Sequence, residues 1–355
     1  MMPTIQEKIG LMIQTGFRGF TLDGNDPVIV DIGKHHIGGI VLFDYDDVTK
    51  TFRRNIRSPE QLKSLTQSLR GHFSHPFVVS IDQEGGIVNR LKPAYGFPET
   101  YSHKFLGEMN DTDFTYRHAS LIAKTLKEHG ITLNLAPVLD LALNRENKII
   151  YGKERCFSND PEKVTDHARA FIRAHRNHGV LTTVKHFPGH GSSAGDTHLG
   201  MVDVTGTWNE TELIPYRTLI REDMIDMLMT THVFNRNLDP DYPATLSRKI
   251  ITGILREQLR FDGVVMTDDL QMLAIKDHFG LERAIELALN AGADIINVGN
   301  NMEYNEDICG RIVGIMLDLI EKKKISEERI DESFRRIEKL LFSATGHPIF
   351  KKSMQ

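Results

Sequence analysis

The sequence predicts an α/β fold, and the architecture that fits it best is a single (β/α)8 barrel of the TIM type. Eight short apolar runs alternate with amphipathic stretches along the 355 residues. Each run is too short for a buried helix and is bounded by Gly, Pro or Asp, which is typical of a buried strand. Repeated strand–helix alternation predicts parallel strands joined by crossover helices. The count of eight favours a closed barrel and leaves a doubly wound open sheet as the alternative.

The predicted strands are spread along the chain, from Leu11 near its start to Ile295 in its last quarter. They are LMIQTGF from Leu11, GGIVLF from Gly38, FVVSID from Phe77, LNLAPVLD from Leu133, TTVKHF from Thr182, MLMTTH from Met227, VVMTDD from Val264 and IINVG from Ile295. Long connections follow two of them, over residues 92–112 and 143–161. In a barrel, long loops after strands build the active site.

Helical patterns occupy the segments between these strands. The stretch from Ser58 has a capping serine, Pro59 at the first helical position and three leucines on one face. Further helical spacing occurs around 116–126, from Ser247, over 282–291 before Gly292, and over about 326–343 as a C-terminal helix. No linker or low-complexity tract separates these elements, so residues 1–355 are predicted to form one domain.

Composition excludes several classes of protein. Lysine and arginine number 43 against 48 aspartates and glutamates, a net charge of −5 that gives no field for nucleic acid or an anionic membrane. No run of about 18 apolar residues occurs. The first residues lack a basic segment followed by an apolar one, so we expect no signal peptide and a cytoplasmic location. Two cysteines in a chain of this length do not indicate a disulfide framework. The sequence does not specify an oligomeric state.

Ionisable residues end several of the apolar strands. Asp82 ends one, Lys185 and His186 lie near the end of another, His232 ends a third, and Asp268 with its neighbour ends a fourth. A charge at the end of a buried strand is costly unless it is paired or hydrated. Because the carboxyl ends of barrel strands converge on one mouth, we expect these groups to form a site there.

The segment KHFPGHGSSAGDTHLG contains a candidate acid/base pair. Asp196 stands two residues before His198 in a loop rich in Gly and Ser. A carboxylate beside an imidazole selects its tautomer and stabilises its charged form, so His198 is a credible general acid/base.

The adjacent carboxylates of Asp268 and Asp269 allow a metal site, a shared-proton pair or a single nucleophile. Successive side chains of a strand point to opposite faces. We therefore expect one of the two to face the mouth and the other to cap or pair locally.

These motifs resemble those of glycoside hydrolase family 3, in its single-domain β-N-acetylglucosaminidase branch. The loop KHFPGHG, followed four residues later by Asp-Thr-His, is similar to the family's signature loop, and FDGVVMTDDLQM is similar to its nucleophile block. Other similar blocks, in the family's order, are GGIVLF, DQEGG with Asn89-Arg90-Leu91, LAPVLD, Arg155-Cys156-Phe157-Ser158 and PATLS. The resemblance also implies a (β/α)8-like barrel.

The resemblance implies a role for each matching residue. Asp268 would be the nucleophile, and His198, assisted by Asp196, the acid/base. The sugar contacts would be Asp82, Arg90, Arg155, Lys185 and His186. Two departures are Ile87, where the family usually has Arg, and Ser192-Ser193, where the branch usually has Asp-Thr. Neither is a catalytic position.

The activity implied is that of a retaining exo-β-N-acetylglucosaminidase. It would remove terminal N-acetylglucosamine from oligosaccharides or from muropeptides in peptidoglycan recycling, through a covalent glycosyl-aspartate. The predicted partner is a carbohydrate, and neither a metal nor a cofactor is expected.

Three alternatives stay open at this point. One is a phosphorylase on the same scaffold, because a histidine tolerates an anionic acceptor better than a carboxylate does. Another is a catalytically silent sugar-binding protein. The third is a metal-dependent hydrolase built on His186, His190, His232 and the aspartate pair. Pro188 and Gly189 break any helix that would align the first two of those histidines.

Overall fold

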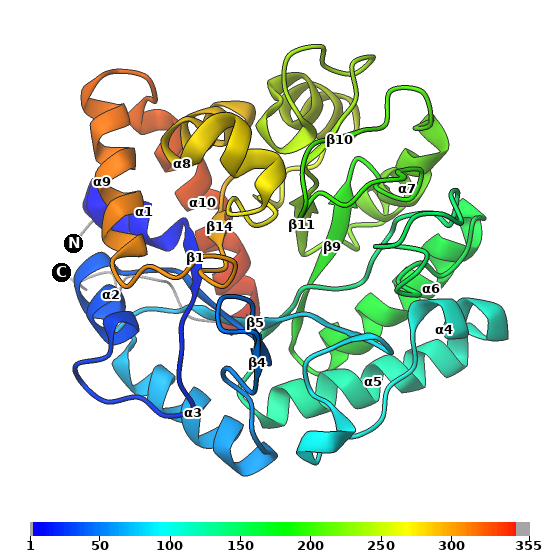
Figure 1. Ribbon diagram of the computed structural model, residues 1–355, viewed down its shortest axis with the longest axis horizontal. Helices are drawn as coiled ribbons and strands as arrows, with labels where there is room; N and C mark the ends of the chain where they lie inside the picture. Colours follow the sequence, from blue (N-terminus) through cyan, green and yellow to red (C-terminus); the bar gives the residue numbers. More distant parts are fainter. Residues whose placement is uncertain (1–2, 346–355) are drawn as a thin grey trace.

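A parallel eight-stranded sheet forms the centre of the computed structural model, which describes residues 3–345 (Figure 1). Its strands are β1 (Ile13–Gly16), β2 (Gly39–Leu42), β5 (Val78–Ile81), β8 (Leu133–Asn134), β9 (Leu181–Phe187), β11 (Met227–Thr230), β13 (Val264–Met266) and β14 (Ile296–Val298). Seven of the eight predicted apolar runs contain one of these strands, and the run from Thr182 covers all of β9 except Leu181.

The strands follow chain order around the sheet, and the sheet curls back on itself. The first strand, β1, pairs with both β2 and β14, so it does not lie at an edge. A parallel bridge between Met266 and Ile295 joins β13 to the start of β14 and nearly completes the ring. A doubly wound sheet would instead stay open, with two unpaired edge strands, and its strand order would reverse direction beside the first strand. The predicted barrel is therefore confirmed, and the open sheet is wrong.

Helices surround the strands on the outside of the ring (Figure 1). They are α1 (Ile5–Leu11), α2 (Pro27–His35), α3 (Pro59–His72), α4 (His103–Met109), α5 (Thr112–Glu128), α6 (Pro161–Asn177), α7 (Ile214–Arg221), α8 (Leu273–Ala291), α9 (Ile308–Glu321), α10 (Glu327–Thr345) and the π-helical segment η4 (Lys249–Gln258). Short 3-10 turns are η1 (Pro93–Tyr95), η2 (Glu210–Leu213) and η3 (Ala244–Leu246). No described helix is both long and apolar enough to cross a membrane.

Local signals in the sequence fix several helix ends. The Ser58 hydroxyl accepts a hydrogen bond from the Gln61 backbone at 3.3 Å and caps α3 as predicted. Gly292, with φ 114°, ends α8 in the left-handed region, where a side chain would add strain. The helix predicted over 282–291 is the second part of α8, because Gly280 (φ 68°) interrupts the helix before it.

The segment after Ser247 departs from the prediction. It forms the π-helical η4, with Ile250, Ile251 and Leu255 buried against the barrel. Ile254, which α-helical spacing places on the same face, is only partly buried. Packing against the neighbouring strands, which the local pattern does not contain, therefore selects the buried side chains.

Three small ribbons lie among the connections that leave the strands. They are β3–β4 (Tyr45–Asp46 and Thr51–Phe52), β6–β7 (Gln83–Gly85 and Val88–Asn89) and β10–β12 (Val202–Asp203 and Val233–Phe234). The first two follow β2 and β5 directly, so they extend from the carboxyl ends of the barrel strands. Of the predicted long connections, 143–161 is irregular, whereas 92–112 contains η1 and α4. These ribbons and loops surround the mouth of the barrel.

Candidate active site

A cavity of about 350 Å³ opens at the carboxyl ends of the barrel strands. All eight site residues predicted from the sequence line it. They are Asp82 after β5, Arg90 after the β6–β7 ribbon, Arg155 in the 143–161 connection, Lys185 and His186 on β9, Asp196 and His198 in the following loop, and Asp268 after β13. Residues up to 186 positions apart in the sequence are thus brought to one place, as the barrel geometry predicts.

Four charged side chains form one linked group, which we name the charged floor: Asp82, Glu84, Arg155 and Lys185. Lys185 Nζ lies 2.7 Å from Asp82 Oδ1 and 2.8 Å from Glu84 Oε1. Arg155 donates two hydrogen bonds to Glu84, at 2.9 and 2.8 Å. The side chains of Lys185 and Glu84 are 2% and 1% exposed. Their orientation is therefore fixed before any substrate arrives.

The electrostatics keep the floor ionised. Burial raises the pKa of Glu84, but Arg155 and Lys185 outweigh it and hold that pKa well below its ordinary value. The same balance, with Lys185 and Arg90 as the cations, lowers the pKa of Asp82. Asp82, which lines the cavity, can therefore accept hydrogen bonds from sugar hydroxyl groups at neutral pH, whereas the buried Glu84 carboxylate holds Arg155 and Lys185 in place.

His186 is held by hydrogen bonds on both sides of its ring. Its Nδ1 lies 2.7 Å from Asp140 Oδ2, and its Nε2 lies 3.2 Å from Arg155 Nη2. Arginine only donates, so Nε2 accepts and the ring proton lies on Nδ1, facing Asp140. Asp140 also accepts from the His190 backbone at 2.8 Å and is 1% exposed. Asp140 therefore fixes both the tautomer and the ring plane of His186.

Arg90 is held more loosely than the floor. Its guanidinium lies 3.5 Å from Asp82 Oδ2 and 3.6 Å from Asp44 Oδ1, and its side chain is 28% exposed. Asp44 is fully buried and also pairs with Lys92. Arg90 thus keeps part of its hydrogen-bonding surface toward the cavity.

Three histidines act on the carboxylate of Asp268. Burial raises its pKa, but His232, His186 and His198 outweigh that effect and lower it below the ordinary value. Its Oδ1 accepts from the Asp269 backbone at 2.8 Å. An ionised carboxylate in this position has the charge state that a nucleophile needs.

The two adjacent aspartates are placed differently, and Asp269 pairs locally as expected for one of them, because its Oδ1 accepts a hydrogen bond from the Gln271 backbone at 3.0 Å. Both Asp268 and Asp269 line the cavity. Strand β13 ends at Met266, so the alternation of a strand no longer applies at these positions. Burial raises the pKa of Asp269 to about 6, although backbone hydrogen bonds from Gln271 and Gly299 act to lower it. The two carboxyl groups therefore differ in their tendency to ionise.

Asp196 and His198 form a pair that we name the dyad. Asp196 Oδ1 accepts hydrogen bonds from His198 Nδ1 at 2.8 Å and from the His198 backbone at 2.9 Å. The side chains are 24% and 48% exposed, respectively. Within the described residues nothing bonds to His198 Nε2, so that nitrogen is available to a substrate atom.

The metal-site alternative does not match the arrangement of the histidines. His190 Nδ1 lies 2.8 Å from the Ser193 hydroxyl, and the ring is buried. His232 lies 3.0 Å from the Thr245 hydroxyl and 2.9 Å from the Asp269 carbonyl. Among residues 3–345, no three His, Cys, Asp or Glu side chains are grouped closely enough to hold a metal ion. These histidines instead complete hydrogen bonds inside the protein.

Four residues of the site were not singled out from the sequence: Asp44, Glu84, Asp140 and Lys153. Asp44 and Asp140 stand at the ends of predicted strands, so the signal that identified Asp82 was also present for them. Glu84 lies in the DQEGG block. Lys153 lines the cavity beside Arg155, and burial lowers its pKa. No local pattern marks Lys153.

A barrel with ionised carboxylates and imidazoles around a polar cavity at its carboxyl end is the architecture of a barrel enzyme that acts on a polar small molecule. Comparison with known proteins makes this class specific. The family described as Glycosyl hydrolase family 3 N terminal domain matches residues 4–340. The chain therefore belongs to glycosyl hydrolase family 3 and is a glycoside hydrolase, which confirms the predicted family.

Individual relatives agree with this assignment. A beta-hexosaminidase of Tolumonas auensis is 36% identical over 270 residues, which cover 75% of this chain and 76% of the relative. The structure of a family 3 beta-N-acetylglucosaminidase from Paenibacillus sp. str. FPU-7 has 32% identity and a TM-score of 0.87, and the match covers 99% of this chain and 65% of that one. A beta-N-acetylhexosaminidase from Beutenbergia cavernae has 26% identity and a TM-score of 0.84, over 97% and 99% of the two chains.

Proposed function

We propose that this chain is a retaining exo-β-N-acetylglucosaminidase that removes terminal N-acetylglucosamine from oligosaccharides or muropeptides. The observation that carries the proposal is the shared cavity of a half-buried, ionised Asp268, a partly exposed Asp196–His198 dyad and the cavity-lining members of a paired charged floor. The named relatives, which are β-hexosaminidases and β-N-acetylglucosaminidases, support the choice of sugar.

In the first step an Asp268 carboxylate oxygen attacks the anomeric carbon of the terminal sugar. The bond from that carbon to the leaving oxygen breaks, and its electron pair departs with the oxygen. Protonated His198 gives its Nε2 proton to that oxygen, while Asp196 stabilises the ring's charge before the transfer. The result is a glycosyl-aspartate ester and a neutral imidazole.

In the second step water attacks the same carbon from the side that the leaving group vacated. Neutral His198 takes a proton from that water, and the ester bond to Asp268 breaks with its electrons returning to the carboxylate. Two inversions at one carbon give net retention of configuration. Access of water to His198 agrees with its 48% exposure.

The charged floor and its neighbours hold the sugar during both steps. Asp82 accepts from ring hydroxyl groups, while Arg90, Arg155 and Lys185 donate to them. Because these groups are already paired with one another, little reorganisation accompanies binding.

A time course with N-acetylglucosaminyl and glucosyl chromogenic substrates tests the proposal, with the first-formed anomer identified by proton NMR. We expect cleavage of the N-acetylglucosaminide, a clear preference over the glucoside, and the β-anomer first. An inverted product contradicts the covalent mechanism. Trapping with a fluorinated glycoside followed by peptide mapping should label Asp268, and a label elsewhere contradicts its assignment.

The same assay separates the alternatives. Sugar 1-phosphate formed in phosphate buffer would indicate a phosphorylase, and binding of the sugar without turnover would indicate a silent sugar-binding protein. Muropeptide and chitin-type oligosaccharides, offered at equal concentration, measure which leaving group the enzyme prefers.

A further inference from the structure

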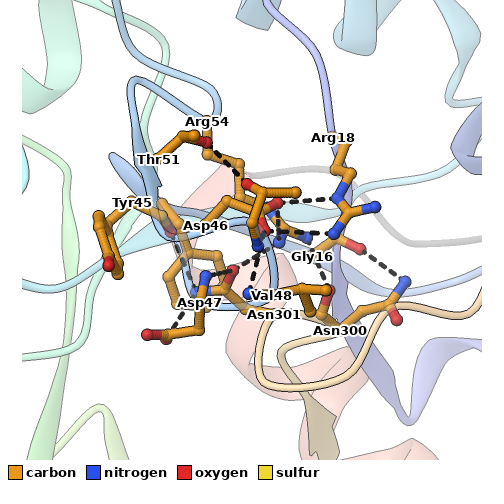
Figure 2. A network of polar contacts seen from close by, with 12 residues as sticks. Gly16, Arg18, Tyr45, Asp46, Asp47, Val48, Thr51, Arg54, Asn300 and Asn301 are labelled. Atoms are coloured by element: carbon orange, nitrogen blue, oxygen red, sulfur yellow. Dashed lines mark hydrogen bonds and ion pairs between the residues drawn. The ribbon is translucent and has the colours of Figure 1, made fainter.

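The β3–β4 hairpin at the cavity mouth is held by an unusually complete polar network (Figure 2). Arg54, whose side chain is 1% exposed, donates to Asp46 Oδ2 at 3.0 Å and to the Asn300 carbonyl at 2.7 Å. Arg18 makes two further bonds to Asp46, at 2.8 and 3.2 Å. Asn301 donates to the Tyr45 carbonyl at 3.1 Å. The hairpin is therefore fixed to the loop that follows β14, which is distant in the sequence but adjacent in space.

The network surrounds a hairpin whose backbone includes unfavourable left-handed conformations. Lys50 and Arg53, both in or next to the turn, have left-handed φ values of 55° and 69°. Such values are uncommon for residues other than glycine and persist where surrounding contacts determine them. Burial raises the pKa of Asp46, but Arg18, Thr49 and Arg54 outweigh it and hold it well below the ordinary value. The carboxylate stays charged, and the network stays intact.

This rigid hairpin presents one aromatic ring and one carboxylate to the cavity, and Phe52 lies outside the cavity lining, next to that ring. Tyr45 lines the cavity together with Asp47, and Figure 2 shows the Tyr45 ring pointing away from the Arg54–Asp46 network. Phe52 packs against Tyr45 with ring centroids 5.0 Å apart and is 64% exposed. Among the described residues, the Tyr45 hydroxyl has no hydrogen-bond partner. Exposed aromatic surface on a fixed support beside a polar cavity is typical of a ligand contact.

We propose that Tyr45, Asp47 and Phe52 form the subsite for the leaving sugar, and that its occupant is a neutral pyranose. This inference rests on the proposed function, because only a glycosidase has a leaving sugar to place. A pyranose has an apolar C–H face that packs on an aromatic ring and an edge of hydroxyl groups that donates to a carboxylate such as Asp47. A leaving sugar that carries its own carboxylate would meet the charge of Asp47 and be disfavoured, because Lys50, 3.9 Å away and 71% exposed, offsets that charge only in part.

The test compares two substrates in the full chain: N,N′-diacetylchitobiose, which has a leaving sugar, and N-acetylglucosaminyl fluoride, which has none. For Tyr45→Ala and for Phe52→Ala we expect the ratio of kcat/KM for disaccharide over fluoride to fall on the order of 10-fold, mainly through KM. Tyr45→Phe should keep most of the ratio. Phe342→Ala, at an exposed phenylalanine on α10 (51% exposed), is the matched control and should not change the ratio.

An unchanged ratio in both alanine variants overturns the subsite. A third substrate, whose leaving sugar bears a carboxylate, tests the charge argument: wild type should prefer the neutral disaccharide, and Asp47→Asn should narrow that preference. No preference in wild type overturns the choice of a neutral occupant.

Failure of the proposed function would be recognised separately, as wild type releasing no N-acetylglucosamine from either substrate. Calorimetry on the Asp268→Asn variant then decides the subsite without turnover. A tighter binding of disaccharide than of N-acetylglucosamine, lost when Tyr45→Ala is added, supports it. Equal binding of the two sugars overturns it.

Discussion

The charged floor and the dyad lie in the same cavity, but their surroundings are opposite. In the floor, Lys185 and Glu84 are almost fully buried and each has at least two charged contacts. In the dyad, His198 is half exposed and its ring bonds only to Asp196 among the described residues. Groups that bind a sugar gain from a fixed arrangement. A group that passes protons to a leaving group and then to water needs access to both.

The largest effect is expected from replacing Asp268, the proposed nucleophile. Asp268→Asn should lower kcat by about 10⁴-fold or more, because an amide does not form the glycosyl ester. Single-turnover kinetics with an N-acetylglucosaminide checks this. Asp269→Asn is the matched control next to it and should lose far less. Similar losses in both variants would contradict the assignment of a single nucleophile.

Breaking the dyad should reduce activity without reducing stability. His198→Ala should lower kcat/KM by about 10²–10⁴-fold, and by less for substrates with a good leaving group. The melting temperature should change little, because the side chain is half exposed and makes one side-chain contact. His278→Ala on α8, also exposed, is the control. If His198→Ala cleaves a natural disaccharide as fast as wild type does, His198 is not the general acid.

Breaking the floor should reduce both activity and stability. Glu84→Gln leaves Arg155 and Lys185 without their shared anion, so the free energy of unfolding should fall by about 3 kcal/mol. Misplaced sugar contacts should lower kcat/KM by about 10²-fold. Denaturant titration and steady-state kinetics measure the two effects, with Glu108→Gln on the exposed face of α4 as control. If Glu84→Gln is as stable as wild type, the charged floor does not stabilise the fold more than the dyad does.

An effect confined to stability concerns Glu212, whose side chain bonds to the loop that carries the dyad. Its Oε2 accepts from the Gly191 backbone at 3.1 Å, and burial raises its pKa to about 8. The native state therefore keeps this proton up to about pH 8, whereas the unfolded chain releases it near 4.5. Because the native state binds more protons between these values, this group makes stability fall as pH rises through that window.

Melting temperatures across pH 5–8 check this effect. The difference between Glu212→Gln and wild type should grow in favour of the variant toward pH 8. Glu210→Gln, exposed in the same turn, is the control and should show no such trend. A constant difference would mean that Glu212 is ionised throughout the range.

Much of the fold and site could be predicted because their signals are local. Each strand corresponds to an apolar run that ends at Gly, Pro or a polar residue. A polar residue directly after a strand therefore lies at the mouth of the barrel. This reasoning found Asp82, Lys185 and Asp268. The same signal marks Asp44 and Asp140, which also stand at the ends of predicted strands.

The partners of those residues could not be predicted in this way. Asp140 orients His186 from 46 residues away, Glu84 holds Arg155 across 71, and Asn301 meets Arg54 across 247. That both Asp268 and Asp269 line the cavity was not predicted either, since it depends on where β13 stops pairing. Such contacts arise from the closure of the barrel, which no local pattern describes.

The order of amino acids by itself therefore determined the barrel, its strands and the set of chemical groups at its mouth, because hydrophobic periodicity and strand ends are encoded residue by residue. Only the tertiary structure decided which groups became buried and paired, which stayed open to water, and where the aromatic hairpin was anchored. Burial and charge pairing depend on neighbours that are distant in the chain, and those neighbours set each group's ionisation and freedom to move.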